Sequence, residues 1–123
     1  MKGTTVLAPV GSGVAIDPSR EGRLVAASPV GGTVEKLHPH LYVIRTAHGA
    51  AVLVQLGIDT IRLAGTGFEP LVTENATVDA GDPVVSWDAG DVEASGFSPI
   101  CPIVALDASA EALSGLVEAG EVA

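Results

Sequence analysis

Short apolar runs broken by glycine and proline constrain the fold of this chain more than any other feature. The 123 residues include 15 glycines and 8 prolines, too many for a helical bundle, because both residues are costly inside helices. Runs rich in valine, isoleucine, leucine and alanine recur at 24–27, 33–37, 41–46, 51–56 and 84–87. This pattern is typical of short strands joined by turns. It predicts an all-β fold, a compact antiparallel sandwich or barrel.

Further elements are expected between these runs. Strands are predicted at 6–10, 13–16 and 98–106, the last at an edge or bulged because Pro99 and Pro102 interrupt it. Residues 68–72 are expected to form a strand or a short turn. Asp88 is expected to cap a short helix over 89–94, and Ser109 a second over 110–118, giving one or two short helices. Two pairs of fragments echo each other, 8–14 with 28–34 and 78–84 with 117–122. Such echoes favour duplicated half-motifs over chance similarity.

Charge and cysteine content exclude several classes of protein. The net charge is −9 with only 6 Lys+Arg, so no basic patch for a nucleic-acid backbone can form. An acidic chain suits a basic protein partner instead, if the acidity does more than aid solubility. A lone cysteine, Cys101, fits a reducing, cytoplasmic setting. Residues 1–5 do not begin a secretory signal, and no apolar run approaches the ~20 residues of a membrane span.

The most informative stretch is 52–60, where an apolar strand ends in one polar side chain, Gln55. Residues 41–46 and 51–56 are expected to form a hairpin with a two-residue turn. A turn at 47–48 places His40 opposite Gln55, and a turn at 48–49 places them one diagonal apart. Either register puts His38, His40 and Gln55 on one face, because side chains alternate along a strand. Leu53, Leu56 and Ile58 are candidates for the apolar strand that carries the site, and Asp59 flanks it.

Other chemistries fit the residues less well. His38 and His40 could hold zinc in a hydrolase of related architecture, with Asp59 or Asp17 as third ligand, or could be ordinary surface histidines. The sequence contains neither a phosphate-binding P-loop nor a Gly-x-Ser-x-Gly nucleophile elbow. Cys101 lies in an apolar run and is expected to be a small buried hydrophobe. We therefore expect no metal and no cofactor.

The central motif resembles a known family. It reads Leu53-Val54-Gln55-Leu56-Gly57-Ile58-Asp59-Thr60, followed by Gly65-Thr66-Gly67-Phe68. It resembles the glucose-family enzyme IIA of the bacterial phosphoenolpyruvate-dependent sugar phosphotransferase system. Segments 13–18, 27–34, 37–40, 80–88 and 98–103 occur in the family's order, and the 38–40 and 98–102 segments are most similar to the actinobacterial branch. The resemblance covers nearly the whole chain.

The resemblance implies a phosphocarrier with two facing histidines. Such a protein takes a phosphoryl group from the carrier HPr and passes it to the IIB domain of a sugar permease. His40 matches the supporting histidine, whereas Gln55 stands at the position of the phosphoryl-acceptor histidine. An amide nitrogen is not a useful nucleophile, because its lone pair is delocalised into the carbonyl. Gln55 is therefore expected to keep the shape of the site and remove its phosphoryl chemistry.

Two further expectations follow from the resemblance. A chain that cannot be phosphorylated could serve as a regulatory binding protein for permeases or metabolic enzymes. Residues 1–123 are expected to form a single IIA-like domain that is shortened at both ends, because a first hairpin and a last strand of the family have no counterpart in the sequence.

Overall fold

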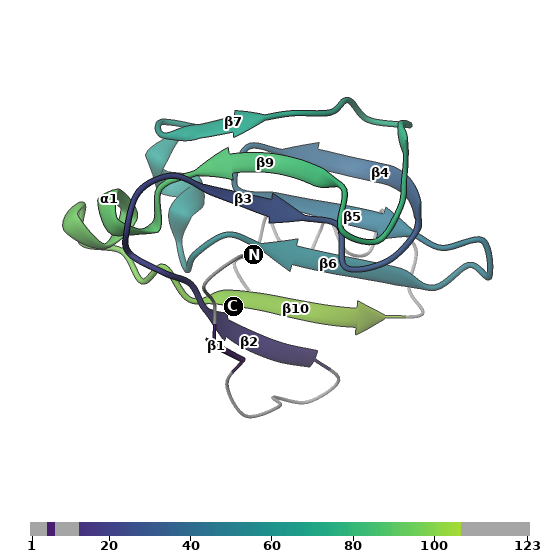
Figure 1. Cartoon of the computed structure of the whole chain (residues 1–123), viewed down its shortest axis with the longest axis horizontal. Helices are drawn as coiled ribbons and strands as arrows, with labels where there is room; N and C mark the ends of the chain where they lie inside the picture. The colour runs from purple at the N-terminus through teal and green to yellow at the C-terminus, as the bar shows by residue number, and fades with distance from the viewer. Residues whose placement is uncertain (1–4, 7–12, 107–123) are drawn as a thin grey trace.

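Two antiparallel sheets form the fold of the protein, whose computed structural model describes residues 5–6 and 13–106. The larger sheet has seven strands in the order β1 (Thr5–Val6), β2 (Gly13–Asp17), β10 (Cys101–Leu106), β6 (Ala51–Gln55), β5 (Leu41–Arg45), β4 (Gly32–His38) and β8 (Thr77–Val78). The smaller sheet has the order β3 (Leu24–Ala27), β9 (Pro83–Trp87) and β7 (Phe68–Pro70). Figure 1 shows the smaller sheet lying over one face of the larger. The expected all-β antiparallel sandwich is confirmed, and the sheets do not close into a barrel.

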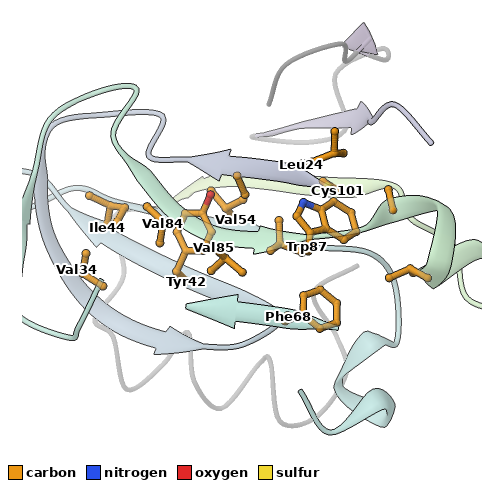
Figure 2. Close-up of a cluster of buried hydrophobic side chains, with 14 of the residues drawn as sticks. Leu24, Val34, Tyr42, Ile44, Val54, Phe68, Val84, Val85, Trp87 and Cys101 are labelled. Atoms are coloured by element: carbon orange, nitrogen blue, oxygen red, sulfur yellow. The ribbon is translucent and has the colours of Figure 1, made fainter. Parts of the chain in front are cut away.

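The core lies between the two sheets. Trp87 of β9 is fully buried and stacks on Phe68 of β7, with ring centroids 5.9 Å apart. The Tyr42 hydroxyl of β5 donates to the Ala27 carbonyl of β3 at 2.8 Å and so ties one sheet to the other. Figure 2 shows these rings among aliphatic side chains from both sheets. Valine, leucine and isoleucine supply most of the remaining contacts, as expected for a chain with 3% aromatic residues.

Two short helical segments follow strands of the sandwich. Asp88 caps α1 (Ala89–Ala94), and its carboxylate accepts from the Asp91 N–H at 3.0 Å. This confirms the first predicted helix, and Gly96 follows it in a left-handed conformation, with φ 93°. A 3₁₀ helix, η1 (Thr60–Leu63), follows β6 after a loop formed by residues 56–59. The second predicted helix, over 110–118, lies outside the described residues.

Most predicted strands between residues 13 and 106 are present within one or two residues of their expected bounds. The predicted strand over 6–10 reaches the described residues only at β1. Fragments 8–14 and 117–122, one from each pair of sequence echoes, lie largely or wholly outside them. The duplication therefore stays a prediction.

The strand over 98–106 was expected to be an edge or bulged strand, and both expectations are wrong: β10 is not at an edge, and its described ladders have no register shift. β10 lies between β2 and β6 in the larger sheet. Pro102 pairs with Ala15 of β2, but the ladder to β6 begins only at Ile103, opposite Val54. The proline, which has no N–H to donate, therefore lies where the strand is paired on one side alone. A central strand can tolerate a proline at such a point.

Candidate functional site

The turn between β5 and β6 sets the register of the candidate site. Arg45 pairs with Ala51, and the Thr46 N–H donates to the Ala50 carbonyl at 2.9 Å. Three residues therefore form the loop, and the third, Gly49, has the left-handed φ of 86° that such loops need. Both predicted two-residue turns are wrong, because a three-residue loop changes the register by one residue.

This register pairs Gln55 with Leu41 and not with His40. Leu41 pairs in turn with His38 of β4. Side chains that pair across antiparallel strands share a face, so His38, Leu41 and Gln55 form one row across three strands. This face of the larger sheet is opposite to the one that contributes Tyr42 and Val54 to the core. His38 and Gln55 thus share a face, as predicted.

His40 lies in a turn and not on a strand. β4 ends at His38 and β5 begins at Leu41, so Pro39 and His40 form a two-residue hairpin turn. The predicted placement of both histidines on one side of a strand is therefore wrong. The turn nevertheless brings their rings together, with centroids 6.0 Å apart. The Leu56 N–H donates to the His40 carbonyl at 2.7 Å, which fixes His40 beside the end of β6.

The Gln55 side chain is held by the loop that follows it. It is only 6% exposed, and its Nε2 donates to the Gly57 carbonyl at 3.0 Å. A carbonyl can only accept, so the nitrogen end of the amide must face Gly57. The Oε1 atom is then the end that remains available. Within the part of the chain that the structure describes, no hydrogen bond joins Gln55 to His40.

The loop after Gln55 is tightly constrained. Gly57 has φ 85°, and a Cβ there would lie 2.6 Å from the Thr60 Cγ2 and 2.9 Å from the Ser98 carbonyl oxygen. The buried Thr60 hydroxyl donates to the Leu56 carbonyl at 2.7 Å. The Ile58 N–H donates to the Ser98 carbonyl at 2.9 Å. These bonds fix the position of the Gly57 carbonyl and therefore the orientation of the Gln55 amide.

Burial determines the charge state of His40. The residue is 7% exposed. Desolvation, with a smaller contribution from neighbouring His38, lowers the pKa of His40 from 6.5 to about 4. Its imidazole is therefore neutral at neutral pH and offers one N–H donor and one lone pair. The candidate site thus combines an oriented amide with a neutral imidazole beside it.

The remaining predicted site residues lie at different depths. Leu53 is fully buried on the same face of β6 as Gln55. Leu56 and Ile58 lie beyond the end of β6, so their predicted place on the site strand is wrong, and Leu56 packs in the core between the sheets. Ile58 is half-buried, and Asp59 is exposed in a left-handed conformation before η1, without a capping hydrogen bond from its side chain.

Two contacts and one exposed side chain at this end of the sheet were not predicted. The carbonyl of Ser98 anchors the loop, and backbone contacts of this kind leave no signal in a sequence. Ile61 on η1 is 51% exposed. A Cβ on Gly65 would lie 3.3 Å from the Pro39 ring, so the loop after η1 passes close to the His38–His40 turn. Of these three features, only the isoleucine at position 61, an apolar residue close to the motif, could have been noticed in the sequence.

A metal site and a membrane-spanning helix find no support among the described residues, and one pocket lies away from the candidate site. Among the described residues, no three histidine, cysteine, aspartate or glutamate side chains are placed to hold a metal ion, so no third ligand joins His38 and His40 there. None of the helices in the described ranges is long and apolar enough to span a membrane. An open pocket of about 500 Å³ lies at the opposite end of β4 and β5, where Glu35 and Arg45 form an ion pair.

The sequence comparisons agree with one another on the family of the relatives that they find. Residues 7–110 match the family model described as phosphoenolpyruvate-dependent sugar phosphotransferase system, EIIA 1. The chain is 37% identical over 110 residues to the N-acetylglucosamine-specific EIICBA component of Escherichia coli, with 88% of this chain and 16% of that protein covered. It is 39% identical over 97 residues to the glucose-specific EIIA component of Bacillus cereus, with 77% of this chain and 57% of that protein covered. The chain therefore spans only part of each relative's length. The expected actinobacterial likeness stays a prediction.

A solved structure also resembles the fold. The glucose permease IIA from Mycoplasma capricolum matches with a TM-score of 0.70 and 33% identity, over 80% of this chain and 62% of that one. The family match covers most of the chain, and the sandwich fold agrees with it. The chain therefore belongs to the EIIA 1 family of the phosphoenolpyruvate-dependent sugar phosphotransferase system.

Proposed function

We propose that residues 1–123 form one enzyme IIA domain whose phosphoryl-acceptor position is Gln55 and which does not itself carry phosphate. The observation that carries this proposal is the Gln55 amide, nearly buried and bonded through Nε2 to the Gly57 carbonyl. A nucleophile needs a free lone pair on the attacking atom. The amide nitrogen has none available, and here it is also used as a donor.

The surroundings of Gln55 remain suited to an acceptor histidine. The Gly57 carbonyl would accept from one nitrogen of an imidazole at position 55, which leaves the lone pair of the other nitrogen free. His40 lies beside that position in the neutral form. The tight loop between Gly57 and Thr60 keeps the carbonyl in place. A single change therefore separates this site from one with a nucleophile.

The proposed partners are HPr and the IIB domain of a sugar permease. A net charge of −9 favours approach of a basic partner surface. Exposed Asp59 and Ile61, next to the site, offer the acidic and apolar contacts that such a surface would use. A domain that binds these partners but cannot accept phosphate acts as a regulatory binding protein, in a cytoplasmic setting. Asp59, Ile58 and His38 are the proposed partner contacts around Gln55 and His40. Leu53 and Leu56, also predicted as binding residues, are fully buried and support the strand instead.

The test is phosphoryl transfer to the intact chain and to Gln55→His. Each protein is incubated with phosphoenolpyruvate, enzyme I and HPr, and its intact mass is measured. We expect no phosphate on the natural chain and one phosphate on Gln55→His. His48→Gln, a change at the exposed tip of the β5–β6 hairpin, serves as the matched control and should behave as the natural chain. A phosphate mapped to His38 or His40 of the natural chain would refute the proposal.

Binding to HPr separates a regulatory domain from an inactive one. We expect the natural chain to bind HPr in the absence of phosphoenolpyruvate, with an affinity similar to that of Gln55→His. A chain that neither binds HPr nor gains phosphate as Gln55→His lacks both functions.

A further inference from the structure

The Gln55 amide presents only one kind of hydrogen-bonding group to a partner. Its Nε2 donates to the Gly57 carbonyl. That carbonyl is fixed by the Thr60 bond to the Leu56 carbonyl and by the Ile58 bond to Ser98. Rotation of the amide would bring two carbonyl oxygens together, which is unfavourable. The orientation is therefore locked, and the available atom is the acceptor Oε1.

Positive charge near this acceptor is limited among the described residues. Arg62 on η1 lies over the Phe97 ring, 5.9 Å from its centroid. Arg45 is at the far end of β5, where it pairs with Glu35. Lys36 is on the same sheet face, but it pairs with Val43, two positions along β4 from His38. His38 is exposed and next to His40, and Asp59 adds negative charge.

A phosphoryl group and an unmodified donor would meet different environments here. Phosphoryl oxygens are anionic and accept hydrogen bonds. They would face the Gln55 Oε1, also an acceptor, and among the described residues the neutral His40 next to it contributes a single N–H. An unphosphorylated side chain with an N–H group would instead donate to Oε1. A polar group buried without a partner is unfavourable, and more so when it is charged.

We propose that the Gln55 site binds the unphosphorylated form of its protein partner in preference to the phosphorylated form, because its locked amide presents an acceptor. This inference rests on the proposed function, which supplies HPr as the partner. The domain would thus sense the phosphorylation state of the carrier without changing its own. It would be occupied when the carrier has lost its phosphoryl group and released when the carrier is charged.

The experiment compares the affinity of the natural chain for HPr and for phospho-HPr. Phospho-HPr is prepared with phosphoenolpyruvate and enzyme I, and binding is measured by titration calorimetry at fixed salt. We expect HPr to bind about tenfold more tightly than phospho-HPr. Gln55→Met, which keeps the length of the side chain and removes the acceptor, should bring the two affinities within about twofold. His48→Gln should keep the natural preference.

The possible outcomes are distinct. Equal affinities of the natural chain for the two forms, or an unchanged preference in Gln55→Met, would overturn the inference. The first comparison needs no variant, so it holds even if Gln55→Met is unstable. If Gln55→His accepts phosphate while the natural chain does not discriminate, the inference alone fails. If neither form of HPr binds, both the inference and the proposed function fail.

Discussion

Replacing Gly57 with alanine tests whether the loop after Gln55 is as constrained as its geometry indicates. Gly57 has φ 85°, where an L side chain is strained. A Cβ there would also lie 2.6 Å from the Thr60 Cγ2 and 2.9 Å from the Ser98 oxygen. Gly67 has nearly the same φ, 87°, but has no heavy atom within 4 Å of its Cβ position. Gly67→Ala is therefore a matched control for backbone strain without overlap.

The expected magnitudes come from these two contributions. Left-handed backbone costs an alanine about 1–2 kcal/mol, so Gly67→Ala should lower the free energy of unfolding by that amount. Overlap in a packed site adds about 1–3 kcal/mol, so Gly57→Ala should lose about 2–5 kcal/mol. The added cost arises because one of the overlapping atoms is a backbone carbonyl oxygen, which cannot move away by changing rotamer.

Urea unfolding followed by circular dichroism gives both free energies with a common slope. A nuclear magnetic resonance spectrum of the Gln55 side-chain amide reports whether its bond to the Gly57 carbonyl survives. We expect the amide signal to shift in Gly57→Ala and to stay in place in Gly67→Ala. If Gly57→Ala costs no more than Gly67→Ala, the loop is not constrained as described and the locked amide loses its structural basis.

Two further predictions follow from the buried titratable groups. The pKa of His40 is lowered to about 4. The unfolded chain therefore takes up the proton first, so the contribution of His40 to stability is present above pH 6.5 and is lost as the pH falls to about 4. In urea unfolding at several pH values, the free energy of unfolding should fall less steeply over that range in His40→Gln than in the natural chain, and parallel curves would contradict this. Burial raises the pKa of Cys101 to about 12. This single thiol should therefore resist alkylation at pH 8 in the folded protein and react at the ordinary rate in urea. Rapid labelling of the folded chain would contradict this, because it would show that the thiol is accessible.

Local chemistry made much of the fold predictable. Glycine and proline mark the ends of short apolar runs, so most strands between residues 13 and 106 could be placed closely. Asp88 was identifiable as a helix cap because its carboxylate needs only the N–H of Asp91, three residues later. Cys101 was expected to be a small buried hydrophobe and is fully buried in the core.

Nonlocal pairing was harder to predict. The position of β10 between β2 and β6 depends on strands far apart in the sequence. Pro99 and Pro102 suggested an edge or a bulge, because the sequence does not show that pairing with β6 begins only at Ile103. The Ser98 carbonyl that holds the loop was invisible for a similar reason, since any residue could supply it.

The sequence by itself determined the chemistry available at the site, an amide at position 55 with a histidine and a tight glycine loop near it. Only the tertiary structure decided how these groups meet. Gly49 adopts a left-handed conformation and makes the β5–β6 loop three residues long, which pairs Gln55 with Leu41. His40 lies in the adjoining turn. The physical reason is that side chains alternate along strands, so one residue in a loop decides which groups share a face.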